Sequence, residues 1–325
     1  MNHILVVGVA AAWICSSGRS PAVVFAGGGL EQALELAADP SYASVGWVGI
    51  QEGSANYRGT GVLVSPEWVL TAAHNWLSNA VTGLEFHIGG ETYTATPGDW
   101  LQHPSWSASP QVAHDQGADI ALFRLSRPVT GVSPAALYGG VAELGSLVTL
   151  VGAGSAGTLA TGPRPNSTPL LYATTNVIDR VISTPGMSSG GLLGFDFDDG
   201  SAMHNSLAGS AIFNTLGGQV ALSDGLSILA QSSTAALSML EGTSAAGDSG
   251  APAFSNFGNG PVVVGLVSWG VNPTNPTNLY GSGAGDITYL TRVSSAYDWI
   301  YATVPEPGLF FFLLMAIPIW CLRRR

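Results

Sequence analysis

The chain contains no lysine, and its only two cysteines lie close to its ends. It has 325 residues, of which ten are arginine and 21 are aspartate or glutamate. Residues 27–304 hold six of the arginines and twenty of the acidic residues, a net charge of −14. This charge argues against nucleic acid as a partner, because phosphate binding needs a basic face. Since Cys15 and Cys321 lie in terminal apolar segments, we expect the part between them to fold without a disulfide.

Long amphipathic helical periods are also lacking. The chain instead alternates short β-type runs with turns and has 43 glycines, a pattern typical of all-β domains. The segment 126–145, rich in Pro, Gly and Ala, is the expected connection between two sets of strands, and 294–301 is expected to form a closing helix. The expected strands are 45–50, 59–64, 68–71, 84–96 and 119–125 in the first set, and 146–151, 171–178, 251–254, 262–269 and 287–293 in the second.

The N-terminal end has the pattern of an export signal. Residues 4–15 form an apolar run of signal-peptide length, and Val24-Phe25-Ala26 can end at a cleavage site before Gly27. We therefore expect residues 1–26 to be a signal peptide. His3 is the only potential cation ahead of the run, and a buried N-terminal strand is the alternative interpretation.

The C-terminal end is more distinctive. Pro305-Glu306-Pro307 is followed by an apolar stretch at 309–322 and then by three arginines. This order resembles the PEP-CTERM sorting signal of Gram-negative bacteria, which implies passage through the inner membrane and cutting by an exosortase-type enzyme. The stretch is short for a stable membrane span, but the arginines can hold its end in the cytoplasm. We expect 304–325 to be a sorting segment with a short transmembrane span, and a permanent anchor is the alternative.

Three residues in the middle of the chain suggest nucleophilic catalysis. His74 ends the string Thr-Ala-Ala-His, and Ser249 lies in the string Gly-Asp-Ser-Gly. A serine hydroxyl needs an adjacent base to take its proton, and that base needs a third group to fix its tautomer. Asp119 opens the apolar run 120–123, which favours it over Asp115 in a polar stretch. The order His, Asp, Ser distinguishes among the unrelated folds that use this triad.

Together these strings resemble the chymotrypsin-like (trypsin-like) serine proteases. The resemblance implies an all-β fold of two antiparallel six-stranded Greek-key β-barrels with a C-terminal helix. The N-terminal barrel would cover 27–137 and the C-terminal barrel, with a long insertion, 138–303. By the same resemblance Ser249 attacks the peptide carbonyl, His74 acts as general base and then acid, and Asp119 orients His74. The backbone N–H groups of Gly247 and Ser249 would form the oxyanion hole.

The resemblance also implies the residues that bind substrate. Ser268, Trp269 and Gly270 resemble the segment that pairs with the substrate backbone as an added β-strand. Thr243, six residues before the nucleophile, occupies the position that forms the base of the specificity pocket. Because Thr243 carries no charge, cleavage after Arg or Lys is disfavoured, and an apolar or small residue is expected. Asp286 keeps this question open, since it lies close to the expected pocket wall.

Asp248 lies directly before the candidate nucleophile, and the sequence leaves two alternatives for its partner. In animal members of the family, an N-terminal amine freed by a cut pairs with the aspartate before the serine, here Asp248. No Ile-Val-Gly-Gly string precedes Val45, so either the N-terminus is not used or Asp248 has another donor.

Asp196, Asp198 and Asp199 form an acidic turn that offers oxygens to calcium. The spacing is not that of an EF-hand loop, and a solvated turn explains it equally well. No other cofactor or metal is expected.

These features favour a secreted serine endopeptidase acting on polypeptides at the surface of, or outside, a Gram-negative cell. One alternative is a catalytically inactive surface or matrix protein that uses the same scaffold for binding, but the complete set of three residues argues against it. The other is an α/β-hydrolase esterase. Its triad follows the order Ser, Asp, His, whereas the strings quoted above run His, Asp, Ser.

Overall fold

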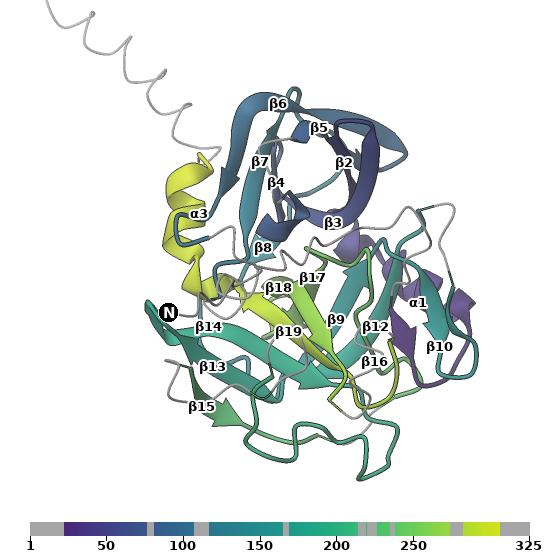
Figure 1. Ribbon diagram of the computed structural model, residues 1–325. Helices are drawn as coiled ribbons and strands as arrows, with labels where there is room; N and C mark the ends of the chain where they lie inside the picture. Colours follow the sequence, from purple (N-terminus) through teal and green to yellow (C-terminus); the bar gives the residue numbers. More distant parts are fainter. Residues whose placement is uncertain are drawn as a thin grey trace, which may run out of the picture.

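The computed structural model describes residues 23–76, 81–106, 117–164, 169–213, 219, 226–234, 238–273 and 282–305. The apolar run 4–15, the alternative carboxylate Asp115 and the sorting residues from 306 onward lie outside the described residues, so the predictions made for them stay predictions. Figure 1 shows two β-rich units, one above the other, with the strands of residues 45–125 in the upper unit.

Six antiparallel strands of the N-terminal half close into a barrel in the order β2-β3-β4-β7-β6-β5. Alternate side chains point inward, as the half-buried pattern of β2 illustrates, and Val48, Ile50, Phe86 and Phe123 fill the interior. This closed barrel confirms the expected architecture of the first unit. Its strands are β2 (Val45–Glu52), β3 (Ala55–Ser65), β4 (Trp68–Thr71), β5 (Val81–Ile88), β6 (Glu91–Gln102) and β7 (Ala121–Leu125).

One expected strand of this barrel is in fact two. The sequence predicts a single strand over 84–96, whereas β5 and β6 pair as an antiparallel hairpin. The turn is made by Gly89 and Gly90, whose φ angles of 61° and 81° lie in the left-handed region that a tight hairpin of this kind requires. Alternating residues continue on both sides of this turn, which is why the pattern alone concealed it.

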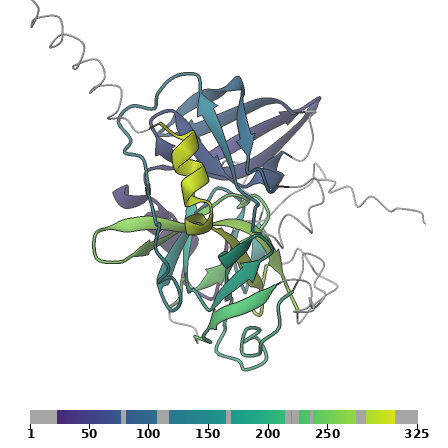
Figure 2. The same ribbon diagram turned by 90° about the vertical axis from the view of Figure 1, so that its left-hand side faces the viewer.

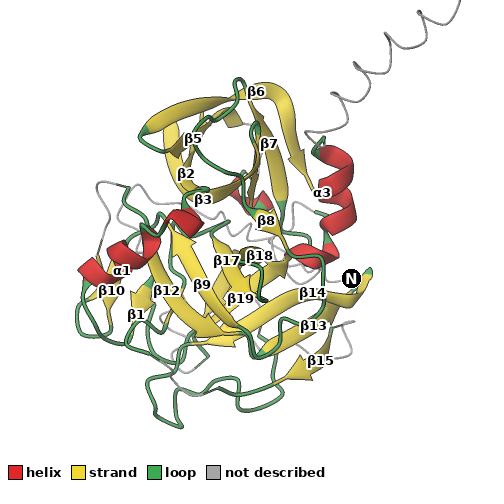
Figure 3. Ribbon diagram, turned by 180° about the vertical axis from the view of Figure 1, so that it is seen from behind, coloured by secondary structure: helices red, strands yellow, loops and turns green. Residues whose placement is uncertain are grey.

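The second unit is a curved antiparallel sheet in the order β12-β9-β17-β18-β19-β14-β13-β15, with β8 added in parallel beside β18. The sheet curls so that β12, at one end, comes back beside β14, near the other end. The Asn176 side-chain amide of β12 donates there to the Asp196 carbonyl of β14 at 2.8 Å. Figure 3 shows this sheet from behind. The strands are β8 (Ala136–Leu137), β9 (Leu147–Gly152), β12 (Tyr172–Val177), β13 (Arg180–Thr184), β14 (Met187–Asp196), β15 (Ser227–Gln231), β17 (Pro252–Asn256), β18 (Pro261–Val271) and β19 (Ile287–Arg292).

Four of these strands, β8 and β13 to β15, were not expected from the sequence. The reason is visible in β14, which carries Gly190, Gly191 and Gly194, residues that are unfavourable in strands and suggest a loop. Pairing with β19 on one side and β13 on the other keeps this glycine-rich segment extended. Part of the long segment before the serine therefore belongs to the sheet.

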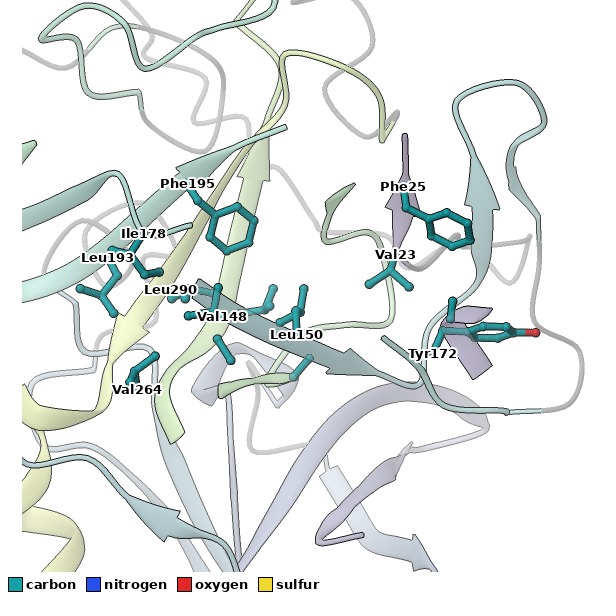
Figure 4. Packing of buried hydrophobic residues seen from close by; sticks show 14 of the residues in the cluster. Val23, Phe25, Val148, Leu150, Tyr172, Ile178, Leu193, Phe195, Val264 and Leu290 are labelled. Carbon is teal, nitrogen blue, oxygen red and sulfur yellow. The ribbon is translucent and has the colours of Figure 1, made fainter. Parts of the chain in front are cut away.

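The first described residues are packed into the second unit. Val23, Val24 and Phe25 are fully buried, and β1 (Val24–Phe25) lies between β10 (Ala156–Thr158) and β16 (Gly242–Thr243). Figure 4 shows Val23 and Phe25 in the same hydrophobic cluster as Leu150. These residues fell within the expected signal peptide 1–26, yet here they form a buried strand. The same small sheet includes β11 (Gly162–Arg164), and the chain continues into α1 (Leu30–Ala37) and η1 (Pro40–Tyr42).

A short helix joins the two units at the end of the described chain. After β19 come η4 (Val293–Ser295) and α3 (Tyr297–Thr303), close to the helix expected at 294–301. Ile300 of α3 packs in a core cluster that includes Leu122 of the first barrel and Leu266 of the second unit. Figure 2 shows α3 lying across both units. Within the described part of the chain, no helix is long and apolar enough to cross a membrane, and the predicted span at 309–322 lies outside it.

A buried ion pair fixes the connecting segment 126–145 to the second unit. Its removal tests how much it contributes to the stability of the fold. Arg292 of β19 donates from Nε and Nη2 to the two carboxylate oxygens of Glu143, at 2.8 and 2.6 Å. Both side chains are almost wholly buried. Removing one member leaves a buried unpaired charge, so we predict that Glu143→Ala lowers the free energy of unfolding by about 3 to 5 kcal/mol.

Urea denaturation of the two proteins measures this loss, and the chain offers a matched control. Glu67 pairs with Arg124 at 2.8 Å, but both side chains are substantially exposed. Glu67→Ala should therefore cost less than about 1 kcal/mol. Equal losses for the two variants would contradict a structural role for the buried pair.

Candidate active site

The histidine sits where the first barrel ends at the boundary between the units. β4 stops at Thr71, and His74 lies in the following turn η2 (Ala73–Asn75). The side chain of Gln102 in β6 holds this turn by donating to the carbonyl oxygens of Ala73 and Trp76, at 2.9 and 2.8 Å. The turn is thus fixed from the neighbouring strand.

The structure brings His74, Asp119 and Ser249 into one hydrogen-bonded chain. The Nδ1 atom of His74 lies 2.6 Å from Oδ2 of Asp119, and its Nε2 atom lies 2.6 Å from the hydroxyl oxygen of Ser249. The backbone N–H of His74 donates to the other oxygen of Asp119 at 2.8 Å. A carboxylate at Nδ1 keeps the proton on that nitrogen and leaves Nε2 free to accept the serine proton.

Asp119 is fully buried and is also held by the second unit. The hydroxyl of Ser268 donates to Oδ2 of Asp119, and the hydroxyl of Thr291 donates to the Asp119 carbonyl oxygen at 3.1 Å. The resemblance places Ser268 in the segment whose backbone pairs with the substrate, and its side chain here supports the carboxylate. Ala118, directly before Asp119, is also fully buried. This agrees with the apolar surroundings for which the sequence favoured Asp119 over Asp115.

The turn that carries Ser249 depends on glycine on both sides. Gly247 and Gly250 have φ angles of 96° and 82°, and a Cβ atom on Gly250 would lie only 2.2 Å from the Thr71 hydroxyl oxygen. The Ser249 carbonyl accepts the N–H of Thr60 at 2.9 Å and the side-chain amide of Asn75 at 3.1 Å. The serine of the second unit is therefore positioned by the first barrel.

The same turn presents backbone donors beside the hydroxyl. Asp248 donates its N–H to the Ala245 carbonyl at 3.0 Å, and Gly250 donates to Val267 at 2.9 Å. Within the described residues, the N–H groups of Gly247 and Ser249, on either side of Asp248, have no such acceptor. Two unengaged donors beside a nucleophile are what a developing oxyanion needs, and one such donor contributes about 3 kcal/mol in catalysis.

Asp248, between these two donors, is fully buried. Its carboxylate accepts the N–H groups of Ala245 at 3.0 Å, of Gly154 at 3.2 Å, and of Val23. Burial raises the pKa of Asp248 to about 7, although these donors oppose the rise. The donors that the sequence left open are thus backbone amides.

The expected base of the specificity pocket is lined with hydroxyl groups. The Thr243 hydroxyl lies 2.9 Å from the hydroxyl of Thr288, which also lies 3.0 Å from the hydroxyl of Ser244. A Cβ on Gly270 would be 3.7 Å from the Ser244 hydroxyl oxygen, so the glycine lies directly beside this cluster. Trp269 is buried and stacks on Tyr289 with ring centroids 4.6 Å apart. These positions carry no charge.

The carboxylate of Asp286 already accepts hydrogen bonds from residues outside the hydroxyl cluster. Its carboxylate accepts the side-chain amide of Asn272 and the N–H of Gly283, the latter at 3.0 Å. Burial raises the pKa of Asp286 to about 8, against the effect of both donors. The hydroxyls of Thr243 and Thr288 bond to each other and not to this carboxylate.

The acidic turn is buried at Asp196 and Asp198 and exposed at Asp199. Asp196 and Asp198 are buried, and Asp196 accepts the Leu207 N–H at 2.8 Å. Asp199 instead pairs with His204 at 2.7 Å. Over the described ranges of the chain, no group of three or more His, Cys, Asp and Glu side chains is placed to hold a metal ion. Burial and the nearby Asp196 charge raise the pKa of Asp198 to about 7.

This buried carboxyl predicts how stability depends on pH. The pKa of Asp198 is about 7 in the folded state against 3.8 for an ordinary aspartate, so the folded state holds the proton more tightly. Its contribution to stability is therefore full below about pH 4 and is lost as the pH rises toward 7. We predict that Asp198→Asn, which removes this titration, gains stability over the parent by roughly 2 kcal/mol between pH 4 and pH 8.

Chemical denaturation at several pH values measures this difference. Asp198 makes no side-chain hydrogen bond in the described structure, so the amide replaces the carboxyl without losing a partner. The exposed Asp298→Asn serves as the control and should show a nearly constant difference from the parent. A difference for Asp198→Asn that stays flat from pH 4 to pH 8 would overturn this account.

Comparison with known families and structures agrees with this geometry. The family model described as Trypsin matches residues 39–221, more than half of the chain. The chain belongs to the trypsin family. Among solved structures it is similar to HL collagenase, at 16% identity with a TM-score of 0.50, over 81% of this chain and 95% of that one. It is also similar to neuropsin, a serine protease expressed in the limbic system of mouse brain, at 20% identity with a TM-score of 0.48, over 81% and 96% of the two chains. No curated protein matches the chain.

The family and fold account for the two-barrel arrangement, with the candidate triad split between the barrels. The supporting residues Thr60, Asn75 and Gln102 were not found from the sequence, because each lies outside the recognisable strings. Asn75 directly follows His74, and a polar residue at that position was the one available signal. The other two act from strands, Thr60 through its backbone N–H and Gln102 through its side chain, and only the fold brings these strands to the site.

Proposed function

We propose that this trypsin-family chain is a serine endopeptidase that hydrolyses peptide bonds through an acyl-enzyme intermediate. The observation that carries the proposal is the continuous hydrogen-bonded chain from Asp119 through His74 to Ser249, with both side-chain contacts at 2.6 Å. A histidine that is merely buried would not need a serine on one nitrogen and a fully buried carboxylate on the other.

Each group has a definite task in this reaction. Nε2 of His74 takes the hydroxyl proton of Ser249 as the oxygen attacks the peptide carbonyl, and Asp119 stabilises the imidazolium that forms. The N–H groups of Gly247 and Ser249 bind the resulting oxyanion. His74 then gives its proton to the leaving amine, and water releases the acyl group by the same steps in reverse. The triad thus returns to its starting state after each turnover.

We predict that the triad acts as a unit. Ser249→Ala or His74→Ala should each lower kcat for a peptide substrate by about a million-fold. Asp119→Asn should lower it by about ten thousand-fold, because the amide stabilises the wrong tautomer of His74. Steady-state kinetics with a chromogenic peptide measures these losses.

Asp115→Asn is the matched control for the aspartate, since it makes the same chemical change four residues earlier. It should leave kcat within a few-fold of the parent. If Asp115→Asn abolishes activity while Asp119→Asn leaves it intact, the assignment of the orienting carboxylate is wrong.

We also propose that the specificity pocket does not select basic residues. Thr243, Ser244 and Thr288 present hydroxyls and no carboxylate, and both oxygens of Asp286 already accept hydrogen bonds. A buried arginine side chain would lack an opposite charge. Peptides that differ only at the residue before the cut should therefore be cleaved at least about 100-fold less efficiently with Arg than with Leu, measured as kcat/KM.

Asp286→Asn tests the alternative directly. If Asp286 plays no part in selection, the ratio of kcat/KM for the two peptides stays within a few-fold of the parent value. Preferential cleavage after Arg, lost in Asp286→Asn, would show that this carboxylate is the pocket acid.

We further propose that the protein is exported and sorted through its C-terminal segment. The support lies in the sequence: an apolar run at 4–15, and Pro305-Glu306-Pro307 followed by a short apolar stretch and three arginines. A Gram-negative host with an exosortase-type enzyme fits this pattern. In that setting the peptidase acts on polypeptides at the cell surface or beyond it.

A further inference from the structure

Aromatic side chains from three separate segments form one continuous row beside the last helix. Phe257, in the turn between β17 and β18, stacks on Tyr138 with ring centroids 4.2 Å apart. The next residue, Gly139, lies against α3, since a Cβ atom there would be 3.1 Å from the Tyr297 ring. Tyr297 in turn packs on Tyr301, one helical turn later, with centroids 4.5 Å apart. We call Tyr138, Phe257, Tyr297 and Tyr301 the aromatic face, and Figure 2 views the molecule from the side on which α3 lies.

The aromatic face is open at the surface of the molecule. Phe257 is 38% exposed and Tyr301 is 48% exposed, and Val141 at the edge of the face is 77% exposed. Val141 belongs to a loop that closes on the face, because the Ala142 N–H donates to the Tyr138 hydroxyl at 3.2 Å. Exposed apolar side chains that gather in one place, and are not scattered singly, mark a surface that takes a partner.

The chemistry of this surface indicates the kind of partner. Residues 138–142 read Tyr-Gly-Gly-Val-Ala and residues 256–261 read Asn-Phe-Gly-Asn-Gly-Pro, so neither segment carries a charge. Asp298 is the single charged residue of 297–305. These segments therefore offer little to a charged partner. Tyrosine rings, with an apolar body and a polar tip, suit the headgroup region of a bilayer, where one end of the ring is in contact with lipid and the other with water.

We propose that the aromatic face rests in the headgroup region of the membrane while the sorting segment holds the chain there. The inference rests on the proposed export and sorting and does not depend on peptidase activity. It gives the folded part a fixed orientation, with α3 against the lipid. It also adds a second contact to the short apolar stretch at 309–322, and two weak anchors together hold a protein on a membrane where one binds only reversibly.

The place of α3 in the chain brings the aromatic face to the membrane. The helix ends at Thr303, and the apolar stretch begins at residue 309. The intervening chain, even when fully extended, reaches about 20 Å at most, so the end of α3 stays close to the bilayer surface. As a helix the stretch at 309–322 would be about 21 Å long, less than the roughly 30 Å of a hydrocarbon core. A span this short draws the residues before it toward the headgroups.

Docking of the aromatic face also positions the sorting motif. Pro305-Glu306-Pro307 lies between α3 and the apolar stretch. With α3 held against the lipid, this motif is kept at the membrane surface, where a membrane-embedded processing enzyme acts. After the cut, the aromatic face has lost the apolar stretch as its companion, and a single weak contact lets the product leave the membrane.

Lipid-quenched fluorescence measures this contact directly. A Gram-negative host without an exosortase-type enzyme exports the chain with 309–322 retained, and the protein is inserted into phosphatidylcholine vesicles that contain nitroxide-labelled lipid. Cys15 and Cys321 are replaced by serine, and a single fluorophore is attached through Asn259→Cys, in the exposed turn that carries Phe257. The control label is attached through Leu30→Cys on α1, which Figures 1 and 3 show on the opposite side of the molecule from α3. The first label should lose at least about half of its fluorescence and the second less than about a tenth.

A charge substitution gives a matched comparison. Phe257 and Leu30 are both 38% exposed. Phe257→Asp places a charge in the contact and should remove most of the quenching of the Asn259→Cys label, whereas Leu30→Asp should leave that quenching unchanged. Added anionic lipid should weaken the contact, since the folded part is acidic. Equal midpoints of urea unfolding show that neither substitution acts by loss of the fold.

Flotation with the vesicles separates this proposal from the sorting proposal. If the chain floats but the Asn259→Cys label is quenched no more than the Leu30→Cys label, the segment inserts and the aromatic face does not dock. A chain that fails to float overturns both proposals. A spectral change of the Asn259→Cys label without lipid, growing with protein concentration, would show that the face binds a second copy of the chain instead. Peptidase activity enters none of these outcomes.

Discussion

The candidate active site depends on hydrogen bonds that join the two β-units across their boundary. Asp119 belongs to the first unit and is held by His74 from that unit and by Ser268 from the other. Ser249 belongs to the second, yet Thr60 and Asn75 of the first bind its carbonyl oxygen. Neither unit alone can therefore place the base, the carboxylate and the nucleophile together. The site is a property of the interface, and the shared cluster around Leu122, Leu266 and Ile300 keeps that interface closed.

Buried carboxylates are the second constraint on this molecule. The chain has no lysine and few arginines, so most buried acids must rely on backbone N–H groups or on being protonated. Within the described residues, the buried Glu143 has an arginine partner in Arg292. For Asp198, Asp248 and Asp286, burial raises the pKa to between about 7 and about 8. An acidic protein of this kind is expected to be more stable in mildly acidic solution than above neutrality.

The sequence predicted the fold class because its recognisable strings and short β-type runs are local features. The same strings pointed to His74 and Ser249, and the apolar run after Asp119 distinguished it from Asp115. What the sequence missed depends on contacts between distant residues. The Ser268 hydroxyl of β18 donates to Asp119 across the boundary between the units, and no local pattern contains that information. Val23 and Phe25 fell within the expected signal peptide 1–26, and the pairing of β1 with β10 and β16 that buries them joins residues far apart in the sequence. The Gly89-Gly90 turn was hidden by the regular alternation of the strands on both sides.

The most direct measurement of the central claim is covalent labelling of the nucleophile. A fluorophosphonate reacts with a serine only when an adjacent base activates the hydroxyl and nearby donors stabilise the adduct. Treatment of the folded protein, followed by peptide mass analysis, should place one adduct on Ser249, and the His74→Ala variant should remain unlabelled. An unlabelled parent protein, or an adduct on a different serine, would contradict the account.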